Sequence, residues 1–171
     1  MKATKSELAI EFRHALATDL TKAESFLRKH PIAIDSPVFG DSESALHFFA
    51  VENRPEVVGW LLAHGAKSNG IGSRSFPLHE AAQLGNLEVC LSLLGAGANP
   101  NLQDCLDETA LHKASGSGRL EIIELLLSSG ADPTIPETCG ELPIDKALPR
   151  KRAEILAMFE RHAAKQRNEE A

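Results

Sequence analysis

Three histidines stand at nearly equal intervals along the chain, and imidazole is a common general base and metal ligand. They are His47, His79 and His112, and each of them directly follows a leucine. Three cysteines, whose thiolates can act as nucleophiles or bind zinc, are the other candidates for chemistry. What these side chains can do depends on the elements that position them.

Each histidine belongs to a segment that reads as two short helices, and residues 108–134 show this most clearly. Thr109 is a good N-cap, because its hydroxyl accepts hydrogen bonds from the free amides of the first helical turn. The glycines and serine of 116–118 end this helix, and Gly130 ends the next one. The second helix has one broad apolar face, formed by Leu120, Ile123, Leu126 and Leu127. Two such helices cannot fold alone, so they require neighbours of the same kind.

The same pattern recurs with the period of the histidines. The leucine pair at 126–127 is preceded by equivalent pairs at 61–62 and 93–94, and a Gly-Ala pair follows each of them. A fixed period with leucine, histidine and glycine in register indicates a stacked solenoid. On these residues the chain resembles the ankyrin-repeat family over residues 41–162. The resemblance implies an all-α ankyrin-repeat solenoid of stacked helix–turn–helix units with projecting β-turn loops.

The repeat boundaries follow from this register, with about three clear repeats between degenerate N- and C-terminal caps. We expect a single domain over 1–171, because each unit must bury its apolar face on the next one. Its parts are a cap at 4–40, repeats at 41–73, 74–106 and 107–139, a C-terminal cap at 140–162 and a polar tail at 163–171. In the N-terminal cap, Thr21 and Glu24 have the spacing of a capping box and predict a helix start there.

The repeat register places the three histidines one unit apart, about 8–10 Å if set by helix packing. That separation exceeds the reach of one zinc ion, whose nitrogen ligands lie at about 2.0–2.1 Å. The resemblance implies instead that each histidine hydrogen-bonds near its helix start and ties one repeat to the next. Thr109 could partner His112 and Ser44 could partner His47, whereas Phe76 offers His79 no hydroxyl. We therefore expect no metal, no cofactor and no catalytic histidine.

The cysteines offer little more. Cys90 falls on the buried face of a helix, where a thiol behaves as a small apolar side chain. Cys105 and Cys139 fall in loops, but Asp104 and Asp107 flank the first of them, and carboxylates do not stabilise a thiolate. The sequence also lacks a Walker loop, a dinucleotide fingerprint and an HExxH motif. These observations favour a protein that is not an enzyme, and a cysteine-dependent enzyme is the weaker alternative.

The charge distribution bears on the partner. The chain has a net charge of −6, and residues 30–149 carry 16 acidic against 6 basic side chains. The excess of acidic side chains in residues 30–149 repels phosphate backbones. This argues against nucleic acid as a partner, despite the basic run at 150–152. It favours another protein with a basic or mixed surface. We expect the chain to be a monomer when free.

No stretch of the sequence has the ~18–20 apolar residues of a membrane span, so we expect no membrane partner. The first residues also lack the apolar core of a secretory signal. These features favour a cytoplasmic location. A periplasmic or secreted location is the alternative if a signal peptide was removed before Met1.

The resemblance also implies where a partner binds, namely on the loop tips and on the concave face lined by the first helices. At the tips the register places Phe39, Ile71, Arg74, Cys105, Leu106, Asp107 and Glu108. On the first helices it places Phe48, Glu52, Glu80, Gln83, Leu84 and Lys113. Each tip could instead fold onto the neighbouring loop, and Phe48 could belong to the core. Gly116 and Ser117 would leave the third repeat shallowly lined, so that a partner's side chain could enter.

The resulting hypothesis is a non-catalytic protein–protein interaction module. The resemblance allows it to act as an inhibitor, or as an immunity or self-protection factor that masks a partner enzyme. The alternative is an adaptor or scaffold without inhibitory action.

Overall fold

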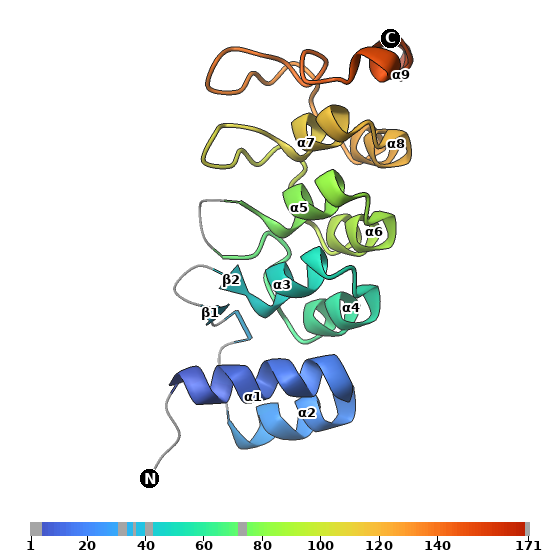
Figure 1. Cartoon of the computed structure of the whole chain (residues 1–171). Coiled ribbons are helices and arrows are strands. Elements are labelled where there is room, and N and C mark those ends of the chain that lie inside the picture. Colours follow the sequence, from blue (N-terminus) through green and yellow to red (C-terminus); the bar gives the residue numbers. More distant parts are fainter. Residues whose placement is uncertain (1–4, 31–33, 36, 40–42, 72–74, 170–171) are drawn as a thin grey trace.

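The computed structural model of the chain describes residues 5–30, 34–35, 37–39, 43–71 and 75–169. Its elements are, in order, α1 Lys5–Thr18, α2 Leu20–Lys29, β1 Pro37–Phe39, β2 Glu43–Ser44, α3 Ala45–Val51, α4 Pro55–Ala63, α5 Pro77–Leu84, α6 Leu87–Gly95, α7 Ala110–Ser117, α8 Leu120–Ser128 and α9 Pro149–Glu169. Apart from two short strands, this part of the chain is a stack of helix pairs (Figure 1). The expected all-α solenoid is confirmed.

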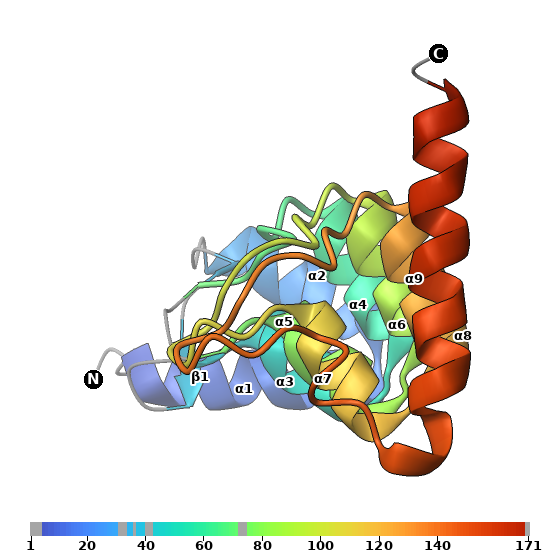
Figure 2. The ribbon, with the colours of Figure 1, turned by 90° about the horizontal axis from the view of Figure 1, so that it is seen from above.

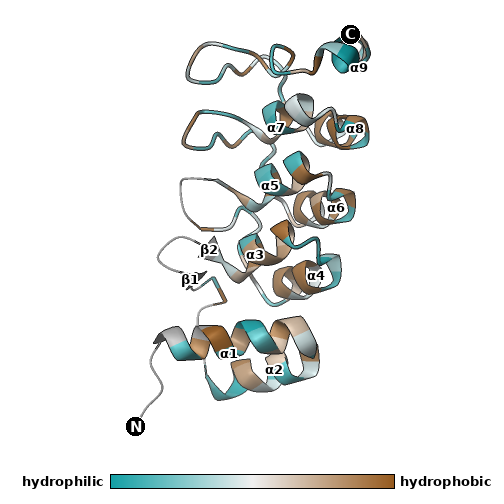
Figure 3. Cartoon of the chain, in the orientation of Figure 1, coloured by the Kyte–Doolittle hydropathy of each residue, from teal (hydrophilic) through white to brown (hydrophobic). Residues whose placement is uncertain are grey.

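The repeats stack with α3, α5 and α7 in an inner row and α4, α6 and α8 in an outer row (Figure 2). Equivalent leucines of the outer helices, Leu61, Leu93 and Leu126, are all fully buried in the core. Apolar residues therefore predominate in the outer row, whereas the inner helices also carry polar ones (Figure 3). This burial of aliphatic surface between neighbouring pairs is the main stabilising force of the stack.

Helix ends follow local chemistry. Pro77 is the first residue of α5, where its missing N–H costs nothing, and Gly85 ends the helix in the left-handed conformation with φ 92°. The capping box expected at Thr21 and Glu24 is wrong. Asp19 is the N-cap of α2, and its carboxylate accepts hydrogen bonds from the amides of Thr21 and Lys22. A carboxylate at this position also interacts favourably with the positive end of the helix dipole.

The N-terminal pair α1–α2 packs below the first repeat. Phe12 and Leu16 of α1 are buried and join the common core, and Phe12 stacks on Phe26 of α2 with 5.7 Å between ring centroids. Between this pair and α3, β1 and β2 form an antiparallel ladder in which Pro37 lies opposite Ser44. The pair thus covers one end of the stack.

Hydrogen bonds also join the loops that follow the outer helices. In each, a side-chain oxygen of one loop accepts from a backbone amide of the next loop, about one repeat further along the chain. These loop rungs join Asp35 Oδ1 to the Lys67 amide at 3.0 Å, Asn69 Oδ1 to the Asn99 amide at 2.8 Å, and Asn101 Oδ1 to the Asp132 amide at 2.8 Å. They fix the spacing of successive repeats along the stack.

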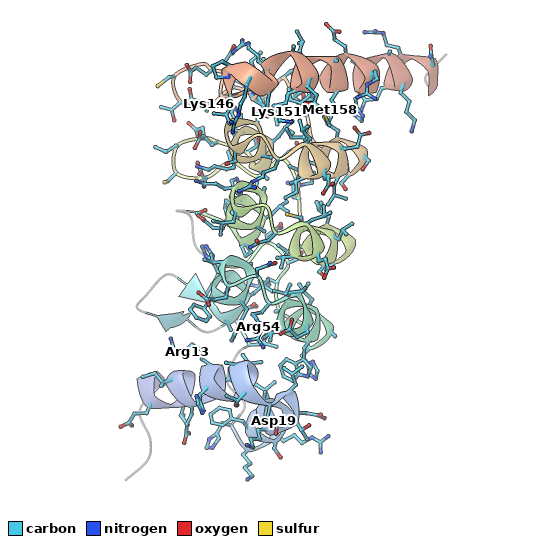
Figure 4. All side chains as sticks on the ribbon, turned by 45° about the vertical axis from the view of Figure 1, so that its right-hand side comes forward. Arg13, Asp19, Arg54, Lys146, Lys151 and Met158 are labelled. Carbon is cyan, nitrogen blue, oxygen red and sulfur yellow. The ribbon has the colours of Figure 1, made fainter. Side chains whose placement is uncertain are left out.

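The last unit differs from the others. Residues 143–147 form turns in place of an inner helix, and α9 replaces the outer helix. Ile155, Met158 and Phe159 of α9 are buried in the common core, and Met158 faces the stack below (Figure 4). α9 continues to Glu169, so residues 163–169 are helical rather than a separate tail. Its end projects past the other elements (Figure 2).

Candidate protein-binding surface

Two of the histidines at the start of the inner helices, His79 and His112, join neighbouring repeats. His112 Nδ1 accepts a hydrogen bond from the Thr109 amide at 3.0 Å and lies 2.9 Å from the Thr109 hydroxyl. Because Nδ1 is an acceptor, the proton is on Nε2, which donates to the carbonyl of Glu141 in the next unit at 3.2 Å. His79 Nε2 makes the equivalent bond to the carbonyl of Glu108 at 2.9 Å.

Two of the three expectations for the histidine rings agree with this geometry. Thr109 partners His112, and His79 has no hydroxyl partner. Nδ1 of His79 is buried and has no hydrogen-bond partner in the described residues, because Phe76 replaces the hydroxyl residue. Ser44 Oγ accepts from the backbone amide of His47 at 3.3 Å rather than from its ring. Burial lowers the pKa of both His79 and His112, against the opposing effect of their hydrogen bonds to carbonyl oxygens. Both therefore serve the fold as neutral imidazoles.

The three cysteine thiols lie in different environments. Cys90 is fully buried, and its burial raises the pKa of the thiol to about 12. Cys105 and Cys139 are exposed in the projecting loops. Within the described ranges, no group of three or more histidine, cysteine or acidic side chains is arranged to hold a metal ion.

We call the projecting loops fingers, and the finger before α7 and that of the last unit are each built around a carboxylate. In the finger before α7, Asp104 Oδ1 accepts from the amides of Leu106 and Glu108 at 2.9 and 3.0 Å. In the next finger Glu137 Oε1 accepts from the amides of Cys139 and Glu141 at 3.0 and 3.2 Å. These bonds close each finger from within, because they satisfy amides that have no partner in a strand or helix.

Two lysines link the finger carboxylates to one another. Lys113 of α7 is 2.9 Å from Asp104 and also pairs with Glu108. Lys146 of the last unit is 2.7 Å from Glu141 and 3.9 Å from both Glu108 and Glu137, so it bridges two fingers (Figure 4). We call these four carboxylates and two lysines the acid–lysine ladder.

Opposite charges within the ladder stabilise one another. Burial alone would raise the pKa of Asp104, but the hydrogen bonds from Lys113 and two backbone amides hold the pKa below its ordinary value. Burial alone would lower the pKa of Lys113, but Glu108 and Asp104 raise the pKa above its ordinary value. Lys113 and Glu108 were expected to face a partner, and the structure pairs them with each other instead.

The residues predicted at the finger tips differ in their exposure to solvent. Leu106 is 55% exposed, and Cys105 and Asp107 beside it are exposed too. The Leu106 carbonyl accepts from the Thr138 amide at 3.1 Å, so adjacent fingers touch through their backbones while the leucine side chain stays free of the core. Ile71 is half-buried. The side chain of Phe39 and the whole of Arg74 lie outside the described residues.

The inner helices present the other expected residues. Phe48 is half-buried, with the guanidinium of Arg13 5.6 Å from its ring centroid. Glu52, Gln83 and Leu84 are exposed. Glu80 is half-buried, and it accepts a hydrogen bond from the Ser75 hydroxyl at 2.7 Å.

Sequence reasoning missed the ladder carboxylates Asp104 and Glu137. A signal was present, since one repeat period separates the members of each pair: Asp104 and Glu137, Glu108 and Glu141, and Lys113 and Lys146. Charged residues that repeat with the period of the fold indicate a structural network.

Within the described part of the chain, no helix is both long and apolar enough to cross a bilayer.

Comparison with known proteins agrees with the repeat architecture. Residues 41–71 match the family model described as "Ankyrin repeat", and residues 78–127 match that described as "Ankyrin repeats (many copies)". The palmitoyltransferase Hip14 of Drosophila melanogaster is 35% identical over 68 residues, and the palmitoyltransferase ZDHHC13 of Mus musculus is 38% identical over 66 residues. Each match covers 37% of this chain and 11% of the relative. This chain therefore spans about a tenth of the length of the curated relatives that it matches.

The stacked helix pairs, the histidines that bridge them and the matched segments together place this chain in the ankyrin-repeat family, whose repeats are protein-interaction modules.

Proposed function

We propose that the chain is a non-catalytic module that binds another protein through its finger tips and the concave face of its inner helices. The observation that supports this most is the exposure of large apolar side chains on a held framework. Leu106 lies on a finger that paired charges hold, and Leu84 lies at a helix end that the hydrogen bond from Asn86 to Ala50 holds. A hydrogen-bonded framework holds such side chains in place before binding, which lowers the entropy cost of forming an interface.

The proposal extends to an inhibitory role, in which the module masks a partner enzyme as an immunity or self-protection factor. An adaptor that leaves its partner active is the second candidate. Catalysis by an exposed cysteine is less well supported, because no histidine accompanies Cys105 or Cys139 in the described hydrogen bonds. The palmitoyltransferase relatives match over too small a part of their length to extend acyl transfer to this chain.

Affinity capture with the purified chain tests the proposal. We expect wild type to capture a defined partner, and the double variant Phe39→Asp plus Leu106→Asp to lose it. The matched control is Leu91→Asp on the outer helix α6, which is 50% exposed and should capture normally. An identical partner set for wild type and the finger variant would contradict a role for the finger tips.

The activity of the captured partner then separates the two roles. An inhibitor abolishes this activity at one equivalent of the chain, whereas an adaptor leaves it intact at saturation.

A further inference from the structure

The concave face of the inner helices differs between its two halves. Three residues of each helix share this face, at one, four and five positions after the histidine, because side chains three and four apart lie on the same side of a helix. They are Phe48, Val51 and Glu52 in α3 and its C-cap, Glu80, Gln83 and Leu84 in α5, and Lys113, Gly116 and Ser117 in α7. We call the part on α3 and α5 the lower groove.

The α7 part of the face is already occupied by the chain itself. Lys113 is 17% exposed and is paired with Asp104 and Glu108 in the ladder. A Cβ atom on Gly116 would lie 3.8 Å from both the Cβ and the carbonyl oxygen of Lys146, so the last unit covers this position. Gly116 and Ser117 are half-buried. The expected entry point for a partner's side chain at the third repeat is therefore shallow and backed by the ladder.

The lower groove is open and apolar at its centre. Val51 and Leu84 are the last residues of α3 and α5, and their side chains are 39% and 45% exposed. Asn86 Nδ2, just beyond α5, donates to the carbonyl of Ala50 at 2.9 Å, which holds these two helix ends together. These two exposed side chains lie at the ends of neighbouring inner helices, and we call them the apolar strip. Burying them against apolar side chains of a partner would favour association.

Carboxylates flank this strip. Glu52 is exposed beside Val51, and Glu80 lies one helical turn before Leu84. Among the described residues neither Glu52 nor Glu80 forms an ion pair. Glu80 stands at the position equivalent to Lys113 and Lys146, so the lower groove carries an anion where the upper repeats carry a cation. Arg13 over the ring of Phe48 marks the lower limit of this anionic region.

We propose that the lower groove binds a cationic amphipathic segment of another protein. The segment lays apolar side chains on Val51 and Leu84 and directs lysine or arginine side chains toward Glu52 and Glu80. The ammonium of such a lysine meets Glu80 as Lys113 meets Glu108 in the ladder, and complementary charge fixes the register of the segment. The inference rests on the proposed function and specifies the partner surface for the concave face.

Two labelled helical peptides test this inference by fluorescence anisotropy with the full chain. One repeats leucine and lysine with an amphipathic period, and the other has glutamate in place of every lysine. We expect the lysine peptide to bind at least about tenfold more tightly than the glutamate peptide. The double variant Glu52→Gln plus Glu80→Gln should lose about tenfold in affinity for the lysine peptide, and Leu84→Ser should lose a similar factor.

The matched control is Glu88→Gln plus Leu91→Ser, which makes one substitution of each kind on the exposed side of α6. An equal loss in this control, or equal affinity for both peptides, would overturn the proposal by showing that attraction is non-specific. Glu80 is half-buried and accepts from Ser75, whereas the other replaced side chains are exposed. Circular dichroism verifies that all variants retain the fold.

Capture of the natural partner distinguishes the two proposals. If the finger variant loses the partner while the groove variants keep it, the module binds protein but the lower groove is not its site. If neither set of variants changes capture, the chain binds its partner through another surface and both proposals are wrong about the site. If wild type captures no partner, the proposed function itself is wrong.

Discussion

His112 makes hydrogen bonds to two repeats at once, so its replacement should destabilise both. His112→Ala leaves the Thr109 amide and the Glu141 carbonyl without their partner and opens a cavity in a buried site. We expect the free energy of unfolding to fall by about 2–4 kcal/mol. Urea denaturation measures this, with His14→Ala as an exposed control that should change stability by less than about 0.5 kcal/mol. A loss no larger than that of the control would show that the bridge contributes little.

The same histidines should make stability depend on pH. Burial lowers the pKa of His79 and His112 in the folded state, so folding favours the neutral form. Their contribution is fully present above the unfolded pKa of about 6.5 and is lost as the pH falls from there through the folded pKa. Carboxylates such as Asp104, whose pKa is lowered, add a further loss only below a pH of about 4.

Urea midpoints at a series of pH values between about 7.5 and 5.5 measure the histidine contribution. The midpoint should fall toward the acidic end, and the fall should be smaller in His79→Gln. A midpoint independent of pH in wild type over this interval would contradict the assignment.

The three cysteines should differ sharply in their reactivity toward thiol reagents. Cys90 is fully buried with its pKa raised to about 12, whereas Cys105 and Cys139 are exposed. Titration of the native protein with a thiol reagent should modify Cys105 and Cys139 promptly, and Cys90 only after denaturant is added. Prompt modification of Cys90 in the native protein would show that the core opens more readily than its packing indicates.

At the scale of elements, the acid–lysine ladder holds the fingers against the inner helices. Lys113→Met removes the cation between Asp104 and Glu108 and leaves two carboxylates close together in a largely buried place. We expect a loss of about 1–3 kcal/mol in the free energy of unfolding, less than for a fully buried pair because Lys113 retains some contact with water.

The control for this change is Lys22→Met, since Lys22 is exposed and 3.9 Å from Asp19. If both lysine variants have the same stability in urea, the ladder contributes no more than an ordinary surface ion pair.

Repeating elements were predictable from the sequence because the stack imposes one period on leucine, histidine and glycine alike. The partnership of His112 with Thr109 and the lack of a partner for Nδ1 of His79 followed from single residues beside them. Asp19 was missed because aspartate and threonine both cap helices, and the choice depends on where the preceding helix ends. The ladder was missed because charged residues were judged by their exposure in the family register and not by their period.

Stability at the scale of the whole molecule should be greatest in the middle of the stack. The helices α5 to α8 are covered by neighbours on both sides, and the contact between α5 and α7 is the most extensive between any two elements in the described residues. Hydrogen exchange should therefore be slowest in the amides of α5 to α8 and faster in α1 and α2. Mass spectrometry of peptic fragments measures this order. Equal protection in α1 and α5 would mean that the chain opens as one cooperative unit.

The loop rungs between successive repeats have a mechanical consequence. The rung from Asn69 to the Asn99 amide and that from Asn101 to the Asp132 amide connect consecutive loops, so a force along the stack loads them in series. Under tension each junction carries the full load, and the weakest one opens first while the others still hold. A molecule pulled from its two ends should therefore lengthen in discrete steps, with one junction between repeats opening at each step.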